Sequence, residues 1–316
     1  MQESILIMMP FTKEYQEQTL SIADGHAVHF IGLEKPAQHL LEDATVIIGN
    51  PTAEDLKCCR HLRWLQVRTA GVDAYLKSGV LPAGTILTNA SGGYGTAISE
   101  YLLAATFSLC RQMHRYRDQQ SHHVWQPVGD IRCIARSTVL VIGSGDIGSK
   151  YAKKMHALGA RVNGIRRSLD SKPEFFGKMG TLDDLDAMLP EADIVALCLP
   201  ANPQTVGLMS AARFSRMKPG ALFLNIGRGV LIDTKALMDA LDAGQIAGAA
   251  LDVTDPEPLP SDHPLWDYEN VIITPHSAGG EYFGVIYDDT IAVCLNNLKR
   301  YLNEEPLKNV AEACQR

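Results

Sequence analysis

A strand-like run that leads directly into a glycine-rich turn is the strongest constraint on the fold of this sequence. The run Val139 to Ile142 is apolar, Gly143-Ser-Gly145-Asp-Ile-Gly148 follows it, and Ser149 to Leu158 has a helical pattern. Here Gly143 permits a tight turn, Gly145 lets the backbone approach a pyrophosphate, and Gly148 allows close packing of helix on strand. The helix N-terminus offers N–H groups and a positive dipole end to phosphates. The segment predicts a dinucleotide-binding site, although glycines also occur in ordinary turns.

Short apolar runs recur along the chain, separated by helix-like stretches, which is typical of α/β folds with parallel sheets. They form two series. The first comprises Ile5 to Met9, Ala27 to Ile31, Thr45 to Gly49, Trp64 to Arg68 and Ile86 to Asn89. The second comprises Val139 to Ile142, Arg161 to Ile165, Ile194 to Leu199, Ala221 to Ile226, Gly248 to Val253 and Val271 to Thr274. We therefore expect two doubly wound domains, each built on a parallel sheet.

Two long helical stretches are placed where the chain would pass between these domains. They are Ala97 to Met113 and Phe283 to Leu302, and neither is interrupted by proline. The second would return the chain to the first domain. We expect one domain at 1–98 and 282–316 and a dinucleotide-binding domain at 99–281.

Composition excludes several classes of protein. The net charge of -7 and the pI of about 5.8 provide no basic field for nucleic acid or an anionic membrane surface. The first ten residues lack a basic leader and a cleavage site, and no stretch is long and apolar enough to span a membrane. The seven cysteines, among them Cys314, are scattered without zinc-like or CxxC spacing. We expect a cytoplasmic protein with reduced thiols and no metal site.

The residues after the second strand of the dinucleotide domain favour NADP over NAD. An acidic residue usually lies there and binds the ribose hydroxyls. This chain instead has Arg166, Arg167 and Ser168, with no acid before Asp170. Guanidinium groups offer paired, permanently charged donors to a 2′-phosphate. The alternative is a solvated loop.

Three polar residues come just after predicted strands of the second series, at the edge where α/β sheets bind ligands. Arg228 can hold a substrate carboxylate and polarise the neighbouring carbonyl. His276 can donate a proton to the alkoxide formed when a nicotinamide delivers hydride. Glu257 can orient the imidazole of His276 and favour its charged form. Each residue alone could be a structural or solvated group, and their common edge is what supports a catalytic set that reduces 2-keto acids.

Four segments in order resemble the motifs of the D-isomer-specific 2-hydroxyacid dehydrogenases. They are Gly143 to Gly148, Asn225-Ile-Gly-Arg-Gly229, Asp252 through Asp255-Pro-Glu257-Pro258, and Thr274-Pro-His276-Ser-Ala-Gly279. Ala70-Gly-Val-Asp73, Tyr94-Gly95 and Ser99-Glu100 resemble the substrate-domain motifs of that family. The resemblance implies a flavodoxin-like substrate domain, a Rossmann-like cofactor domain and a cleft between them. It also implies the roles given above to Arg228, Glu257 and His276.

The resemblance assigns further residues to the site. It implies that the backbone N–H groups of Ala70 and Gly71 bind the substrate carboxylate, that Asp252 and Ala278 lie near the nicotinamide carboxamide, and that Leu199, Pro200 and Thr205 border the adenosine. An ordinary turn at Ala70 and a buried strand end at Leu199 are the structural alternatives. The complete predicted cofactor site comprises Gly143, Gly145, Asp146, Ile147, Gly148, Arg166, Arg167, Ser168, Leu199, Pro200, Thr205, Ile226, Gly227, Asp252, His276 and Ala278.

Several functions remain open for such a site. The segment Arg166 to Ser168 resembles the NADP-preferring members, which favours a glyoxylate/hydroxypyruvate reductase or a reductase of larger 2-keto acids. An NADH-dependent reductase is the first alternative. A dinucleotide-sensing binding protein on the same fold is the second. A formate dehydrogenase is disfavoured because it would have Gln in place of Glu257. Arg136-Ser-Thr138 also departs from the family's usual Gly-Lys-Thr, which we expect to alter only a turn.

The resemblance implies a homodimer formed through the cofactor domains. The contact arm would lie around Arg117 to Arg136, where Gln119 to Trp125 is polar and aromatic. A plain surface loop is the alternative.

Overall fold

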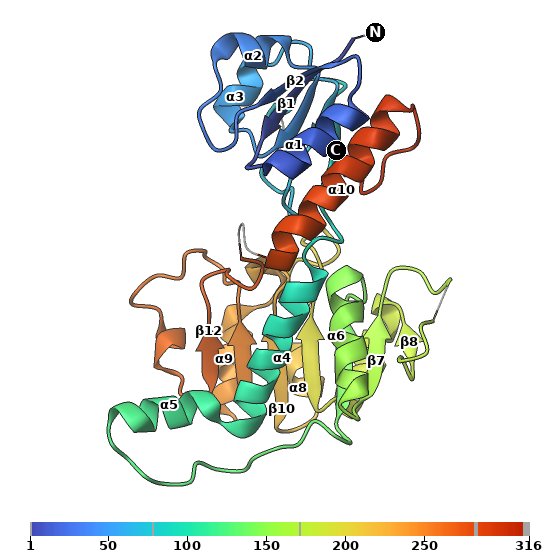
Figure 1. Ribbon diagram of the computed structural model, residues 1–316. Helices are drawn as coiled ribbons and strands as arrows, with labels where there is room; N and C mark the ends of the chain where they lie inside the picture. The colour runs from blue at the N-terminus through green and yellow to red at the C-terminus, as the bar shows by residue number, and fades with distance from the viewer. Residues whose placement is uncertain (1, 78, 171, 281–283, 312–316) are drawn as a thin grey trace. The chain divides into compact units, whose positions relative to one another are not determined.

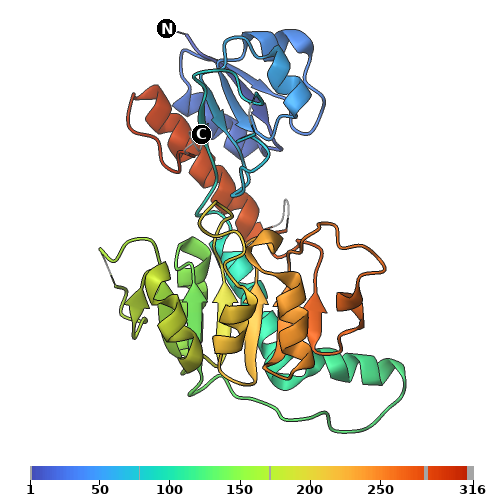
Figure 2. The ribbon, with the colours of Figure 1, turned by 180° about the vertical axis from the view of Figure 1, so that it is seen from behind.

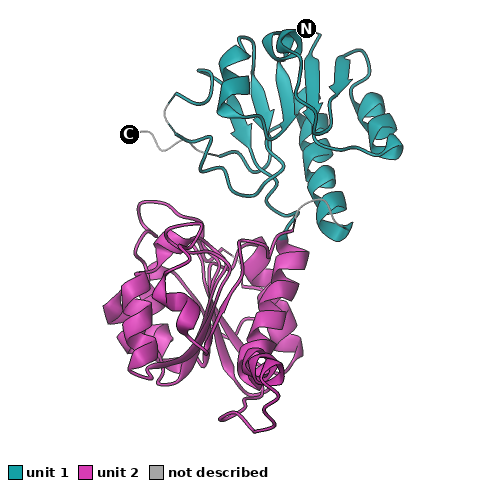
Figure 3. Ribbon diagram, turned by 90° about the vertical axis from the view of Figure 1, so that its left-hand side faces the viewer, with its two compact units in different colours: residues 1–94, 281–316 teal, residues 95–280 magenta. Residues whose placement is uncertain are grey.

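The computed structural model describes residues 2–77, 79–170, 172–280 and 284–311. The chain divides into two compact units, Met1–Tyr94 with Glu281–Arg316 as unit 1 and Gly95–Gly280 as unit 2 (Figure 3). The boundaries expected from the sequence were 98/99 and 281/282. In the structure each boundary precedes the long helix in which a crossing was expected. Phe283, expected to start the second of these helices, and Cys314 lie outside the described residues.

Unit 1 is built on a five-stranded parallel sheet in the order β2-β1-β3-β4-β5, the flavodoxin-like order. Its strands are β1 (Ser4–Met8), β2 (Ala27–Phe30), β3 (Val46–Gly49), β4 (Trp64–Gln66) and β5 (Ile86–Thr88). Its helices are α1 (Lys13–Ile22), α2 (Gln38–Asp43), α3 (Ala53–Cys58) and α10 (Gly284–Leu302). One core cluster joins the sheet to α10 through Ile291 and Leu298, and a second joins the opposite face to α2 and α3 through Leu41 and Leu56.

Unit 2 is built on a seven-stranded parallel sheet in the order β12-β11-β10-β9-β6-β7-β8. Its strands are β6 (Thr138–Ile142), β7 (Arg161–Ile165), β8 (Met179–Gly180), β9 (Ile194–Leu197), β10 (Ala221–Asn225), β11 (Ile246–Leu251) and β12 (Val271–Ile273). Counted from β6, this is the Rossmann order 3-2-1-4-5-6 with one further strand at the end. The expected pair of Rossmann-like, doubly wound parallel-sheet domains is therefore confirmed.

Helices cover both faces of this sheet (Figures 1 and 2). They are α4 (Gly95–Arg111), α5 (Met113–Ser121), α6 (Asp146–Ala157), α7 (Leu185–Met188), α8 (Ala211–Arg216) and α9 (Thr234–Asp242), with 3-10 turns at Leu182–Asp184, Leu189–Glu191, Gly229–Leu231 and Pro264–Asp267. One core cluster packs α4 and α6 on the sheet, and the other packs α7, α8 and α9 on the opposite face. Strands covered on both faces read as continuous apolar runs, as β6 and β10 do.

One local expectation was wrong, and one strand was missed. The helix expected to reach Met113 ends at Arg111, because Gln112 adopts a left-handed backbone (φ 57°) and a second helix, α5, starts after it. The two-residue strand β8 was not expected at all. In the part of the chain that the structure describes, no helix has the length and apolarity needed to cross a membrane.

Candidate active site

The three predicted catalytic residues follow three neighbouring strands of unit 2. Strand β10 pairs with β11 so that Asn225 lies beside Leu251, and β11 pairs with β12 so that Leu251 lies beside Ile273. Because all three strands are parallel, their carboxyl ends meet at one edge of the sheet. Arg228, Glu257 and His276 leave the sheet at that edge, where open α/β sheets bind their ligands.

The turn that carries Arg228 is held by the side chain of Asn225. Its Oδ1 accepts a hydrogen bond from the backbone N of Gly227 (3.0 Å), and its Nδ2 donates to the backbone O of Arg228 (3.0 Å). Asn225 is fully buried, so this amide is a fixed support for the turn. The Arg228 Nη1 donates to the backbone O of Gly227 (2.7 Å), and the side chain is partly exposed. A planar guanidinium is thereby presented at the edge of the sheet.

The residue that follows Arg228, Gly229, must be glycine. A Cβ placed on Gly229 would overlap the backbone carbonyl of Thr254 and lie 2.5 Å from the backbone N of Asp255. The hydroxyl of Thr254 donates to the backbone O of Pro256 (2.9 Å), which shapes the turn into Glu257. The segment that carries Arg228 therefore packs directly against the segment that leads to Glu257.

Glu257 and His276 form a hydrogen-bonded pair. The distance between Glu257 Oε1 and His276 Nδ1 is 2.6 Å, and the two side chains are 42% and 47% exposed. Because an ionised carboxylate only accepts hydrogen bonds, Nδ1 carries the proton and Nε2 is the ring nitrogen available to a substrate. At this exposure the pair contributes little to stability. Its effect is to orient the imidazole.

The backbone of His276 is also held in an uncommon conformation. Its φ is +49°, in the left-handed region that costs a non-glycine residue free energy. Its backbone N donates to the backbone O of Asp252 (2.8 Å). The Asp252 carboxylate is buried and accepts hydrogen bonds from the backbone N of Ser277 (2.9 Å) and of Ala278 (3.1 Å). Asp252 thus holds three consecutive amides of the loop that carries His276.

The glycine turn has the geometry that a dinucleotide requires. Gly143 has a φ of +100°, and a Cβ there would lie 2.9 Å from the backbone of Cys198. A Cβ on Gly148 would collide with the Gly143 carbonyl and lie 2.9 Å from Val141, so helix α6 packs closely on β6. Gly145 faces open space, with no atom within 4 Å of a Cβ built there. A pyrophosphate can therefore approach the backbone at Gly145 and the start of α6, where Asp146 and Ile147 begin the helix.

Asp146 places a negative charge at this helix start. Its carboxylate pairs with Lys150 one turn later (2.9 Å). The charge favours the helix N-terminus and is neutralised locally by the lysine.

Arg166, Arg167 and Ser168 follow the carboxyl end of β7, the strand beside β6. The backbone N of Arg166 donates to the backbone O of Gly180 (2.9 Å), which ties the start of the segment to β8. Arg166 is partly buried, while Arg167 and Ser168 are exposed. The hydroxyl of Ser168 donates to Asp170 (2.7 Å). Two arginines therefore follow the carboxyl end of β7 directly.

Leu199 contacts both the glycine turn after β6 and the turn that carries Arg228. Its side chain lies 2.9 Å from the position of a Cβ on Gly143, and its backbone N lies 3.3 Å from that on Gly227. Pro200 and Thr205 close the following loop, because the buried Thr205 hydroxyl donates to the backbone O of Pro200 (2.8 Å). Ile226 is buried in the core behind the Arg228 turn.

Ala70 and Gly71 belong to unit 1, in the turn after β4. The Thr69 hydroxyl donates to the backbone O of Gly71 (2.8 Å), and Asn50 Oδ1 accepts from the backbone N of Arg68 (3.0 Å). Ala70 and Gly71 are partly exposed. The structure thus brings together Arg228, Glu257 and His276 within unit 2, and places Ala70 and Gly71 at the carboxyl edge of the other sheet.

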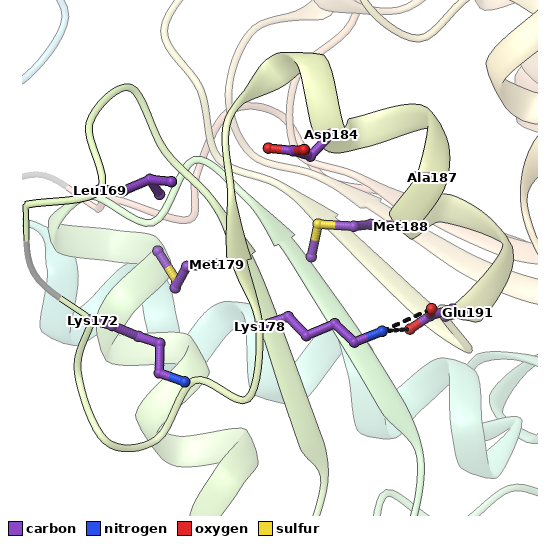
Figure 4. A pocket seen from close by; sticks show the side chains of 8 residues that line it. All are labelled: Leu169, Lys172, Lys178, Met179, Asp184, Ala187, Met188 and Glu191. Carbon is purple, nitrogen blue, oxygen red and sulfur yellow. Dashed lines mark hydrogen bonds and ion pairs between the residues drawn. The ribbon is translucent and has the colours of Figure 1, made fainter.

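A hollow elsewhere on unit 2 is not this site. Figure 4 shows its lining, which combines the apolar side chains of Leu169, Met179 and Met188 with the ion pair of Lys178 and Glu191 (2.7 Å). It lies at the β8 end of the sheet and includes none of the three catalytic candidates.

Several supporting residues were not predicted to have a role. Asn225 and Gly229 lie within a segment quoted for its resemblance, but their contacts with Gly227 and Thr254 depend on the folded chain. Thr274 contacts Asp252 because β12 pairs with β11, and it contacts Tyr101 because α4 packs on this sheet. Sequence spacing carried no signal for these contacts.

Comparison with known proteins identifies the family of this chain. Residues 103–278 match the model of the D-isomer specific 2-hydroxyacid dehydrogenase NAD binding domain. A glyoxylate/hydroxypyruvate reductase A from Yersinia enterocolitica is 32% identical over 255 residues, covering 78% of this chain and 80% of that protein.

Solved structures agree over the whole chain. A D-isomer specific 2-hydroxyacid dehydrogenase family protein from Aeromonas salmonicida superposes with a TM-score of 0.85 at 31% identity, covering 99% of this chain and 100% of that one. An NADPH-dependent glyoxylate/hydroxypyruvate reductase from Sinorhizobium meliloti, solved with NADP and sulfate, has a TM-score of 0.80 at 26% identity and covers 98% of each chain. The chain belongs to the D-isomer-specific 2-hydroxyacid dehydrogenase family and is an NAD(P)-dependent oxidoreductase.

Proposed function

We propose that this enzyme reduces small 2-keto acids to 2-hydroxy acids with NADPH, with glyoxylate and hydroxypyruvate as the first candidate substrates. The observation that carries the proposal is the 2.6 Å hydrogen bond between Glu257 and His276 Nδ1, at the sheet edge that also presents Arg228. Such a set matches the reduction of a carbonyl beside a carboxylate. Similarity to reductases that are named for these substrates supports the choice of candidates.

Arg228, His276 and Glu257 would each have one role in the reduction. The Arg228 guanidinium binds the substrate carboxylate and polarises the adjacent carbonyl oxygen. In unit 1, the backbone N–H groups of Ala70 and Gly71 stay the predicted contacts of a substrate carboxylate. The His276 imidazolium donates its Nε2 proton to the carbonyl oxygen as negative charge develops there. Glu257 keeps Nδ1 protonated and stabilises the cationic ring before transfer. The bound nicotinamide cofactor supplies the hydride.

The cofactor site would be formed by the glycine turn and the segments around it. Gly145 and the start of α6 would hold the pyrophosphate, Leu199, Pro200 and Thr205 would border the adenosine, and Asp252 and Ala278 would lie near the carboxamide. Arg166 and Arg167 would bind a 2′-phosphate, because guanidinium groups pair with phosphate oxygens and none of the residues from Arg166 to Ser168 is acidic. The NADP complex of the Sinorhizobium reductase supports this preference.

Steady-state oxidation of NADPH and of NADH with a panel of 2-keto acids tests the proposal. We expect turnover with glyoxylate or hydroxypyruvate and a higher kcat/KM for NADPH. A preference for NADH would refute the cofactor assignment and leave the reaction intact. Tight NADPH binding measured by calorimetry, without turnover on any keto acid, would refute the reaction and indicate a dinucleotide sensor.

We also propose a cytoplasmic homodimer whose contact arm lies at 117–136. Helix α5 overlaps the start of this arm, and the side chain of Trp125 is fully exposed in the isolated chain. An aromatic side chain of that size is typical of interface anchors. Sedimentation of the wild-type chain and of a Trp125→Ser variant over a range of concentrations tests it. A wild-type monomer at all concentrations would contradict it.

A further inference from the structure

The carboxylate of Asp252 belongs to a series of hydrogen bonds that begins at Tyr101 on α4. Asp252 follows β11 and is only 3% exposed. Its Oδ1 accepts a hydrogen bond from the hydroxyl of Thr274, which follows β12 (2.6 Å). The same Thr274 oxygen lies 2.6 Å from the hydroxyl of Tyr101 on α4. Figure 1 shows α4 lying over one face of the sheet that carries these strands.

The direction of these hydrogen bonds follows from the chemistry of the groups. A threonine hydroxyl has one proton, and the Asp252 carboxylate can only accept. Thr274 therefore gives its proton to Asp252, and Tyr101 must donate to Thr274. Burial raises the pKa of the Tyr101 phenol, so it keeps the proton that it donates. The two hydrogen bonds therefore run in one direction, from Tyr101 to Thr274 and from Thr274 to Asp252. Each hydrogen bond polarises the shared hydroxyl and so strengthens the other.

The far end of this series is the loop of His276. Asp252 accepts the backbone N–H of His276 on its carbonyl, and those of Ser277 and Ala278 on its carboxylate. These bonds hold His276 at its left-handed φ of +49°. A loop in such a conformation persists only where its surroundings determine it strongly.

We propose that Tyr101 is a positioning residue: acting through Thr274, its hydroxyl fixes Asp252 and thereby the loop that presents His276. The effect of Tyr101 on the loop stands on the geometry alone, whereas its effect on turnover rests on the function proposed above. Tyr101 does not act on the substrate itself. Its removal should lower kcat more than it raises KM for the keto acid, because Arg228 is supported separately by Asn225.

Two readouts test this on the full-length protein, one of them independent of activity. Hydrogen exchange reports the protection of the amides of residues 276–278, and steady-state kinetics reports kcat and KM. Tyr101→Phe removes one hydroxyl and leaves the ring. Tyr268→Phe is the matched control. The Tyr268 hydroxyl also donates to an aspartate, Asp242 at the end of α9 (2.9 Å), and Tyr268 precedes β12, whereas Thr274 follows it.

We expect Tyr101→Phe to speed exchange at residues 276–278 and to lower kcat about 3- to 10-fold, the effect of one hydrogen bond, with KM for the keto acid changed by less than about twofold. Tyr268→Phe should change neither. Thr274→Ser keeps the hydroxyl and should resemble the wild type. Thr274→Val should lower kcat and the protection of residues 276–278 more than Tyr101→Phe does. Adding Tyr101→Phe to Thr274→Val should have no further effect, because the connection is already cut.

The proposal would be overturned by unchanged exchange at residues 276–278 in Tyr101→Phe. It would also be overturned if the two substitutions acted independently, so that the losses of Tyr101→Phe and Thr274→Val multiplied in the double variant. A wild-type protein without turnover on any 2-keto acid refutes the proposed function instead. In that case faster exchange in Tyr101→Phe still supports the connection, and unchanged exchange still refutes it.

Discussion

Substitution of Gly229 by alanine would separate the two segments that carry Arg228 and Glu257. The new Cβ would lie 2.5 Å from the backbone N of Asp255, whereas ordinary contact begins at 3.4 Å. Both sides of this contact are backbone, so a rotamer change cannot relieve it. The segments must move apart by more than about 0.9 Å, because the overlap of the Cβ with the Thr254 carbonyl is closer still. A displacement of about 1 Å in a catalytic arrangement can cost about 10²-fold in rate. We therefore expect kcat/KM to fall by about 10²-fold, with a stability loss of about 1–3 kcal/mol.

Gly244→Ala is the matched control. Gly244 has a φ of +66°, and a Cβ added to it would have no atom within 4 Å, so alanine there is strained without a collision. It should destabilise the fold by about 1 kcal/mol and leave kcat/KM unchanged. The assay is NADPH oxidation with the best keto acid, together with urea unfolding of both variants. Wild-type kcat/KM in Gly229→Ala would refute the reasoning, as would an equal loss in Gly244→Ala.

Other substitutions test other parts of the site. His276→Asn should lower kcat by about 10²- to 10⁴-fold through loss of the proton donor, and near-wild-type turnover would mean that another group supplies the proton. The double variant Arg166→Ala and Arg167→Ala should lower kcat/KM for NADPH by about 10- to 100-fold and affect NADH little; equal losses with both cofactors would argue against a 2′-phosphate contact. Burial raises the pKa of the fully buried Cys294 thiol to about 12, so it stays protonated at mildly alkaline pH. A thiol reagent followed by mass spectrometry should therefore label the exposed Cys133 and leave the buried Cys294 unmodified in the native protein, and equal labelling of the two would contradict this burial.

The architecture was accessible from the sequence because strands covered on both faces are apolar along their length. The runs at β6 and β10 stand out for this reason, and the glycine turn after β6 identifies the first strand of the dinucleotide domain. Strand β8 has only two residues, Met179–Gly180, so no periodicity could reveal it. The break at Gln112 was missed because neither glycine nor proline marks it.

The candidate site was accessible to the extent that parallel strands bring their carboxyl ends to one edge. Arg228, Glu257 and His276 could be grouped by that rule alone. Their supports could not, because they depend on contacts between distant residues. The closeness of Gly229 to Thr254 and the series of hydrogen bonds from Tyr101 to Asp252 arise from the packing of loops and of α4, which spacing along the sequence does not encode.

The central claim is that NADPH delivers hydride to the carbonyl carbon of a 2-keto acid at this site. NADPH deuterated at the transferring position of the nicotinamide, incubated with enzyme and glyoxylate, hydroxypyruvate or a longer keto acid, tests it most directly. We expect one deuterium at C2 of a 2-hydroxy acid for each cofactor oxidised, and none with His276→Asn over the same time. Cofactor oxidation without deuterium in the product, or no product from any keto acid, would contradict it.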